Sequence, residues 1–251
     1  MPRFFIDSGD CTEKDRITLT GENARHISLS LRSRVGDMLT LCDGKGTDYE
    51  CVISDITKNE VILSVESTSP CRAEPDIEVT LYQALIKSDK FDTVVQKAVE
   101  LGVTRIVPVL SERCVSRPDD KSLEKKIQRW NKISLEAAMQ SGRGKVPEVL
   151  PAVEFADAID GMLKTDFYFV CYEDEKDISL KQLCENASKT KRIYKTYSFF
   201  VGPEGGISRK EADYAKDNGV TCISLGKRIL RTETAPLCVL SALMYESGNL
   251  G

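Results

Sequence analysis

The sequence predicts an α/β protein in which a small β-rich unit precedes a larger, mostly parallel sheet. Short apolar runs joined by tight turns fill residues 1–70, a pattern typical of a small β-barrel. A polar stretch with Pro70 and Pro75 follows, and we place a linker at residues 71–76. Residues 77–251 then alternate strand-like and helix-like segments, which is the signature of a parallel α/β sheet. We therefore expect two domains, 1–70 and 77–251.

In the first domain, alternating apolar residues and turn signals predict four strands and one helix. The turn at residues 43–46 contains Gly44 and Gly46, which accept positive φ. Lys58 and Asn59 mark a second turn between two alternating runs. The expected strands are residues 3–6, 38–42, 49–56 and 60–65, and the expected helix is residues 21–31.

In the second domain, the apolar period switches repeatedly between strand and helix. Apolar residues at positions 91, 94, 95, 98 and 99 lie on one face of a helix. Ser208 and Glu211 form a capping box that starts another helix, and Pro236 fits the first turn of the last one. The expected strands are residues 77–85, 103–110, 166–172, 197–201 and 221–225, with helices after each and at residues 155–163.

Composition limits the function classes. The chain has 251 residues, 41% of them hydrophobic and 29% charged, which is typical of a soluble protein. No apolar run approaches the ~18 residues of a membrane span, and the charged N-terminus does not resemble a signal peptide. We therefore expect a cytoplasmic protein without a membrane contact. Nine scattered cysteines and one histidine predict free thiols and no metal site.

The net charge of −4 does not indicate a nucleic-acid partner, but its distribution is uneven. Residues 121–145 contain seven lysines and arginines against two glutamates. Such a run binds phosphates in some proteins and is a solvated helix face in others. The sequence leaves both interpretations open.

Two glycine-rich turns stand where two predicted strands end. The first is Gly202-Pro203-Glu204-Gly205-Gly206, and the second begins at Gly226. Strands of a parallel sheet end at the same edge, where ligands usually bind. The spacing matches neither a dinucleotide fingerprint nor a P-loop, and no G-x-S-x-G elbow occurs. The turns instead favour a pocket in which main-chain groups hydrogen-bond an adenine.

Together these motifs resemble the RsmE family of 16S ribosomal RNA (uracil-N3)-methyltransferases, within the SPOUT superfamily. The residues that carry the resemblance lie along nearly the whole chain and are most specific near its C-terminus. They are residues 202–206, Leu225-Gly226, Arg228-Ile229-Leu230-Arg231, Glu233-Thr234-Ala235, residues 3–5, His26, Gln96-Lys97, Glu100-Leu101-Gly102-Val103, residues 111–114, Arg129-Trp130 and residues 140–143.

The resemblance implies a PUA-like N-terminal barrel and a SPOUT domain with a trefoil knot. It implies S-adenosyl-L-methionine as methyl donor, a homodimer, and a uridine in the decoding region of the small ribosomal subunit as acceptor. Carried over residue by residue, it implies cofactor contacts from Gly202, Glu204, Gly205, Gly206, Leu225, Gly226, Arg228, Ile229 and Leu230. It implies RNA contacts from Arg3, Arg25, Arg32, Arg129 and Lys132.

Methylation of N3 of uracil needs the N3 proton to be removed or the resulting anion to be stabilised. Arg231 and Glu233 are loop residues of the right types, so we predict Arg231 as electrostatic stabiliser and Glu233 as base. Glu233 has an alternative role as an ion-pair partner that holds the loop. Arg143 is a third candidate catalytic residue, because a guanidinium suits phosphate or a base edge, and the partner subunit would supply it.

Two other functions remain open at this point. The protein is either the methyltransferase described, a SPOUT methyltransferase for another RNA, or a non-catalytic RNA-binding factor that assists ribosome assembly.

Overall fold

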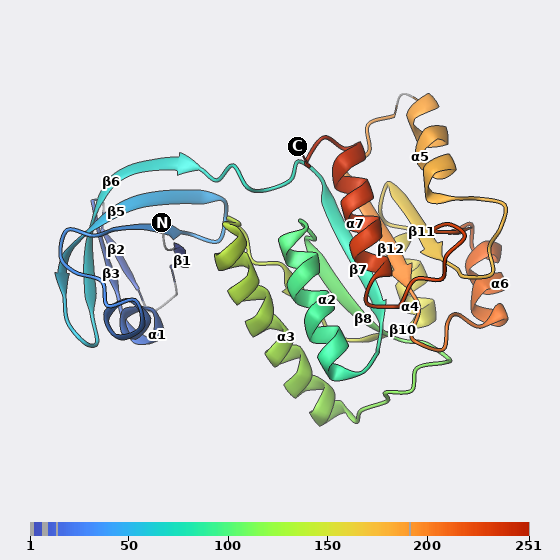
Figure 1. Cartoon of the computed structure of the whole chain (residues 1–251), viewed down its shortest axis with the longest axis horizontal. Coiled ribbons are helices and arrows are strands. Elements are labelled where there is room, and N and C mark those ends of the chain that lie inside the picture. Colours follow the sequence, from blue (N-terminus) through green and yellow to red (C-terminus); the bar gives the residue numbers. More distant parts are fainter. Residues whose placement is uncertain (1–2, 7–9, 14, 191, 251) are drawn as a thin grey trace. The chain divides into compact units, whose positions relative to one another are not determined.

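The computed structural model describes residues 3–6, 10–13, 15–190 and 192–250. Contacts divide the chain into two compact units (Figure 1). Unit 1 comprises Met1–Glu74 and Ala138–Val146, and unit 2 comprises Pro75–Ala137 and Pro147–Gly251. The division falls inside the predicted linker, but the sequence did not indicate that residues 138–146 join the first unit.

Unit 1 is a six-stranded sheet in the order β1-β4-β5-β6-β3-β2, with β1 parallel to β4 and the other pairs antiparallel. Its core contains Phe4, Ile17, Leu19, Ile27 and Leu41, all nearly fully buried. Figure 1 shows the sheet curled, as expected for a small barrel. The strands are β1 (Arg3–Phe5), β2 (Cys11–Glu13), β3 (Arg16–Leu19), β4 (Met38–Cys42), β5 (Thr47–Ile56) and β6 (Val61–Pro70).

Three features of unit 1 differ from the sequence prediction. β2 and β3 were not expected, because both are short and β3 has only two inward apolar side chains, Ile17 and Leu19. β6 continues to Pro70 beside the start of β5, so residues 67–70 are a strand; proline is tolerated at its end. The predicted helix is α1 (Gly21–Arg25) followed by a π-helical segment, His26–Ser30.

Unit 2 is built on a parallel sheet in the order β10-β8-β7-β12-β11-β13, with β9 beside β8. All five predicted strands are confirmed, whereas the two-residue strands β9 and β10 were too short to detect. The strands are β7 (Glu78–Ala84), β8 (Arg105–Leu110), β9 (Glu148–Val149), β10 (Val153–Glu154), β11 (Phe167–Cys171), β12 (Thr196–Val201) and β13 (Thr221–Ile223).

The predicted helices of unit 2 are also present. The capping box at Ser208 and Glu211 is formed at the start of α6. Stacked aromatic pairs, Phe91 with Trp130 and Phe169 with Phe199, lie in the interior. The helices are α2 (Ser88–Glu100), α3 (Asp120–Ser141), α4 (Phe155–Met162), α5 (Leu180–Lys189), α6 (Arg209–Asp217) and α7 (Ala235–Glu246).

The strand order brings distant segments to one edge of this sheet. β11 lies between β12 and β13, so the chain crosses β11 on its way from β12 to β13. After β13 the chain runs back past β11 towards β12 and β7. Thr232 contacts residues at the ends of both strands, and α7 then packs on α2. The trefoil knot implied by the resemblance stays a prediction. No helix in the described part of the chain has the length and apolar character of a membrane span.

Candidate active site

A cavity of about 480 Å³ opens where β11, β12 and β13 end. Its volume lies in the range of small-molecule and cofactor sites, roughly 300–1,000 Å³. All nine residues predicted to bind the cofactor line it, and Arg231 and Glu233 line it as well. The other lining residues are Lys90, Cys171, Tyr172, Glu173, Val201, Pro203, Ser224, Thr232 and Ala235.

The first glycine turn is shaped by its backbone and by Glu173. Gly206 has φ +74°, and its N–H donates to Pro203 O at 2.9 Å. The Glu173 carboxylate accepts the Ile207 N–H at 3.0 Å. A Cβ at Gly206 would overlap that same carboxylate. A side chain at this position would therefore displace Glu173 and disturb the turn.

The loop after β8 braces this turn from outside. Arg113 Nη1 donates to Gly205 O at 3.1 Å. Ser208 Oγ donates to Glu112 Oε2 at 2.7 Å, and Glu112 N donates to Glu211 Oε1 at 2.8 Å. The capping box of α6 is thereby part of a wider network, which fixes the position of the turn relative to the sheet.

The second loop is tied to the first through Thr232, which is 7% exposed. Its hydroxyl donates to Gly202 O at 2.6 Å and accepts from Gln83 Nε2 at 3.1 Å. Gln83 is fully buried in β7. A single hydroxyl thus joins β7, the end of β12 and the loop that carries Arg231 and Glu233.

Charges on the cavity wall are balanced. Glu233 Oε2 pairs with Lys90 Nζ at 3.2 Å, so the ion-pair role considered for Glu233 is present. Glu204 Oε1 accepts the Lys87 N–H at 3.3 Å, just before α2. The lining includes three carboxylates and three cations, namely Glu173, Glu204, Glu233, Lys90, Arg228 and Arg231.

Cys171 lines the cavity but is not a nucleophile. Burial raises the pKa of its thiol well above the usual range, so the thiol stays protonated at neutral pH. Among the described residues, no group of three His, Cys, Asp or Glu side chains could hold a metal ion. The cavity therefore presents main-chain groups, carboxylates and cations to a ligand.

These features fit an adenosine-type cofactor. Gly202, Gly205 and Gly206 line the cavity without a side chain, so their main chain can come close to an adenine edge. The carboxylates of Glu173 and Glu204 can accept hydrogen bonds from hydroxyl or ammonium groups.

Arg143 does not line this cavity and belongs to unit 1. Its side chain is 4% exposed, and its Nε and Nη2 donate to the two oxygens of Glu74 at 3.2 and 2.8 Å. Glu74 Oε1 also accepts the N–H groups of Gly144 and Lys145. Within its own chain, the Arg143 guanidinium thus helps to hold residues 142–145 against Glu74. Its catalytic role remains a prediction.

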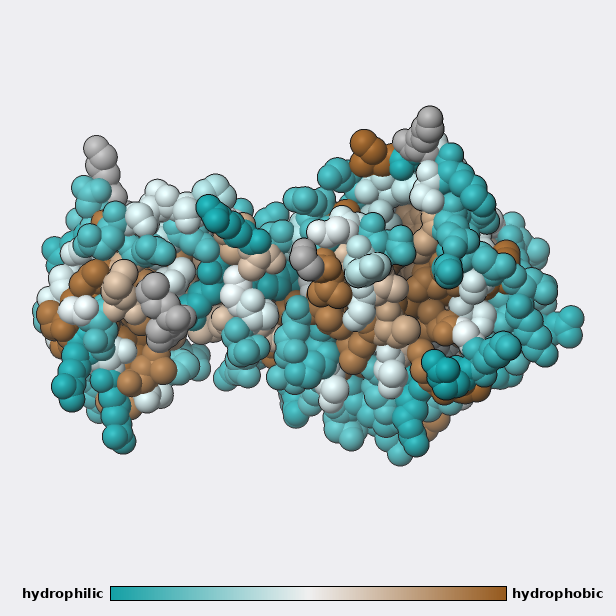
Figure 2. Space-filling view, turned by 45° about the horizontal axis from the view of Figure 1, so that its top comes forward, coloured by the Kyte–Doolittle hydropathy of each residue, from teal (hydrophilic) through white to brown (hydrophobic). Residues whose placement is uncertain are grey.

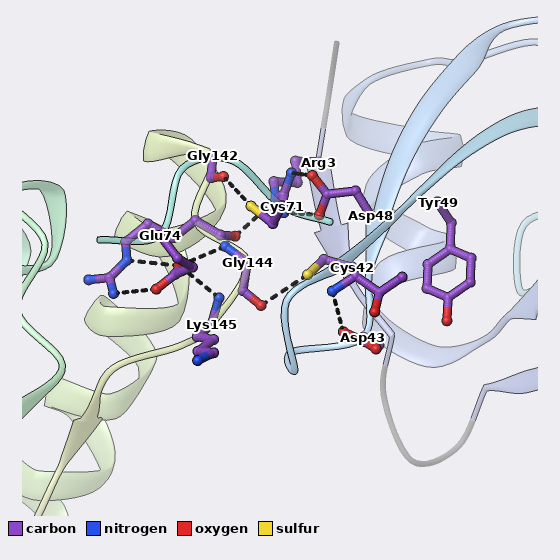
Figure 3. Close-up of polar contacts among 12 residues, drawn as sticks. Arg3, Cys42, Asp43, Asp48, Tyr49, Cys71, Glu74, Gly142, Gly144 and Lys145 are labelled. Atoms are coloured by element: carbon purple, nitrogen blue, oxygen red, sulfur yellow. Dashed lines mark hydrogen bonds and ion pairs between the residues drawn. The ribbon is translucent and has the colours of Figure 1, made fainter. Parts of the chain in front are cut away.

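The residues predicted to contact RNA are spread over both units. Arg3 is 10% exposed and pairs with Asp48, and its Nε donates to Arg143 O at 2.9 Å (Figure 3). Arg25 and Arg32 are exposed in unit 1, and Arg32 has a positive φ of 55°. In α3, Lys132 is exposed and Arg129 pairs with Asp92.

Sequence reasoning missed Lys90, Glu173, Gln83 and Thr232. Each lies far along the chain from the residues it contacts, and only the strand order brings them together. One signal was available: Lys87 and Lys90 directly follow a buried strand at the edge where ligands bind.

Comparison with known proteins matches residues 73–244 to the RNA methyltransferase domain family and residues 19–66 to the RNA methyltransferase PUA domain family. The chain is 35% identical to Ribosomal RNA small subunit methyltransferase E of Bacillus subtilis, over 98% of this chain and 97% of that protein. It is 33% identical to the enzyme of the same name from Aquifex aeolicus, over 80% and 82%.

Solved structures agree with these matches. The structure of Ribosomal RNA small subunit methyltransferase E from Neisseria gonorrhoeae, bound to S-adenosyl methionine, superimposes with a TM-score of 0.85 at 33% identity, covering 98% of this chain and 97% of that one. The fold and the glycine-lined cavity thus define an RNA methyltransferase with an N-terminal PUA domain. Within that class, the chain belongs to the Ribosomal RNA small subunit methyltransferase E family.

Proposed function

We propose that the protein transfers a methyl group from S-adenosyl-L-methionine to N3 of a uridine in the 16S ribosomal RNA of the small subunit. The observation that carries this proposal is the convergence on one cavity of all nine predicted cofactor residues with Arg231 and Glu233. We propose that the protein acts in the cytoplasm and that its substrate there is the small ribosomal subunit.

The two glycine turns are the part of the site that would hold the cofactor. The main chain at Gly202, Gly205, Gly206, Leu225 and Gly226 would hydrogen-bond its adenosine. When bound, S-adenosyl-L-methionine supplies an electrophilic methyl group on a positively charged sulfur. The exposed Arg228 and Ile229 and the half-buried Leu230 would close over it from the second loop.

Arg231 and Glu233 would act on the uracil. N3 is a weak nucleophile while it carries a proton, and the Glu233 carboxylate can accept that proton. The Arg231 guanidinium would stabilise the negative charge that spreads to the carbonyl oxygens of the base. Arg143, in this proposal, reaches the RNA from the partner subunit.

RNA contacts of unit 1 would centre on the π-helical segment and the residues after it. Arg25 and Arg32 are exposed there beside the exposed apolar side chains of Leu29 and Leu31. π-helical turns and positive φ at non-glycine residues are often associated with functional sites. Arg3, Arg129 and Lys132 complete the proposed RNA contacts.

A homodimer is part of the proposal, and α7 supports it. Its inner side chains, such as Val239 and Leu240, are fully buried, yet Cys238 is exposed on the same helix and Tyr245 is 70% exposed. Helices that are apolar all round are normally covered on both sides. Figure 2 shows apolar residues gathered on a face of unit 2.

We expect Tyr245→Glu to shift the sedimentation coefficient from that of a dimer to that of a 27.9 kDa monomer, because a buried unpaired carboxylate opposes association. Lys164→Glu, which also changes an exposed residue of unit 2, is the control and should leave the dimer intact. A wild-type monomer at micromolar concentration would contradict the proposal.

Methylation assays on three RNA substrates test the function. Small ribosomal subunits, naked 16S ribosomal RNA and transfer RNA are incubated with protein and labelled methyl donor, and nucleosides are analysed by mass spectrometry. We expect N3-methyluridine from small subunits. A methyl group found only in another RNA would support a different SPOUT substrate. Absence of cofactor uptake in isothermal titration would identify a non-catalytic RNA-binding factor.

A further inference from the structure

Lys90 is the one ammonium group among the described lining residues, and it comes from a segment that no motif indicated. It lies in the first turn of α2, which begins shortly after β7. Because β7 lies beside β12, this turn adjoins the first glycine turn, and Lys87 N–H reaches Glu204 there. Lys90 therefore enters the cavity from a third segment, far along the chain from the two predicted loops.

The partner of Lys90 is the predicted base. Lys90 Nζ lies 3.2 Å from Glu233 Oε2, and the two side chains are 25% and 23% exposed. Glu233 Oε1 has no hydrogen-bond partner among the described residues. One carboxylate oxygen is thus fixed by a cation, and the other is open to a proton donor. The half-buried position weakens solvent screening of the pair.

We propose that Lys90 is a positioning residue that holds the Glu233 carboxylate in the orientation needed to remove the uracil N3 proton; this rests on the proposed function. In that step the N3–H bond breaks, an O–H bond forms on Glu233, and the N–H electron pair stays on N3. The negative charge passes from the carboxylate to the base while Lys90 stays positive. The cavity therefore keeps the same net charge, so the new anion has a cation nearby throughout.

The test compares three variants. Lys90→Met removes the charge and keeps a similar length, and Lys90→Arg keeps the charge. Lys97→Met is the matched control, because Lys97 lies on the same helix, pairs with Glu100 at 2.8 Å and does not line the cavity. Each variant is assayed for kcat and KM on small subunits, for cofactor affinity by isothermal titration and for thermal stability.

We expect Lys90→Met to lower kcat roughly ten- to a hundredfold, the range for losing a hydrogen bond to a charged group. Cofactor affinity and thermal stability should stay at the wild-type values, Lys90→Arg should recover most of kcat, and Lys97→Met should match wild type. Since Lys90 acts through Glu233, adding Lys90→Met to Glu233→Gln should lower kcat no further.

Three outcomes would overturn the role of Lys90: a wild-type kcat for Lys90→Met, a parallel loss of cofactor affinity or stability, or losses that multiply in the double variant. A wild-type protein that binds cofactor but methylates no uridine in small subunits is a separate result. It would reject the proposed function itself, and the role of Lys90 with it.

Discussion

At Gly206, backbone conformation and packing both require glycine. Its φ of +74° is in the left-handed region, and a Cβ would overlap the Glu173 carboxylate. Gly219 shares only the first requirement, since its φ is +82° but a Cβ added there would meet nothing within 4 Å. Comparing substitutions at the two glycines therefore distinguishes the energetic cost of the left-handed backbone from the cost of the clash with Glu173.

We expect Gly206→Ala to lose more stability than Gly219→Ala. Both changes carry the left-handed penalty of about 1–2 kcal/mol, but only Gly206→Ala displaces Glu173 and its bond to Ile207 N–H. Differential scanning calorimetry measures the difference, and isothermal titration should show weaker cofactor binding only for Gly206→Ala. Equal stability and affinity in the two variants would mean that Glu173 moves aside freely.

Residue-scale prediction from sequence succeeded where the site residues are contiguous. The cofactor residues lie in two short motifs, so one resemblance located all of them together. Gln83 and Thr232 could not be found this way, because their hydrogen bond joins β7 to a loop 149 residues later. Which strands are neighbours depends on the packing of the whole sheet, and local periodicity contains no information about it.

At the scale of elements, detection depended on length. Most of the longer strands and helices have enough periodic positions to be recognised, and the three-residue strands β1 and β13 were found because each lies in a longer apolar run. β9 and β10 have two residues each and could not be distinguished from loop. α3 was predicted as a helix, but its last turn and the residues after it belong to unit 1. The basic residues of α3 do not indicate that the C-terminal end of the helix belongs to a different unit from the rest of it.

Glu74 is one of the residues that attach residues 138–146 to the rest of unit 1. Burial would raise the pKa of Glu74, but the hydrogen bond and charge of Arg143, with the N–H groups of Lys145 and Gly144, lower it overall. The folded-state pKa thus lies below the ordinary value of about 4.3. The stabilisation is therefore complete above that ordinary value and is lost as pH falls through the lower folded-state pKa.

We expect Glu74→Gln to destabilise the protein by roughly 3–5 kcal/mol at pH 7, because it removes the negative charge that pairs with the buried Arg143 guanidinium. The difference from wild type should shrink on acidification from pH 5 to pH 2, as wild-type Glu74 becomes protonated. Thermal unfolding followed by circular dichroism at several pH values measures this. Glu60→Gln, at an exposed turn, is the control. If the difference in stability between Glu74→Gln and wild type does not change with pH, the loss comes from altered packing and not from the lost charge.

For the whole molecule, the main correction concerns what the N-terminal unit contains. Composition and turn signals predicted its strands, but unit 1 also needs a segment from beyond position 137. That segment supplies Met139 to the apolar core and accepts hydrogen bonds from Arg3 and Cys42 (Figure 3). At Gly144 a Cβ would lie 2.5 Å from that of Cys71, so the segment packs closely. The N-terminal unit is therefore discontinuous in sequence.

A fragment of residues 1–76 should consequently fold poorly by itself. Units of this size bury little apolar surface and are marginally stable. Without residues 138–146 the fragment exposes the Met139 contact surface of the core and leaves Glu74 without its buried partners. Joining residues 138–146 to the fragment through a flexible glycine–serine linker restores both, at a modest loop-closure cost.

We expect dispersed amide signals in the NMR spectrum of the joined fragment and collapsed signals for residues 1–76 alone. Equal dispersion in the two spectra would show that the strands alone specify the unit, and that residues 138–146 only pack onto it.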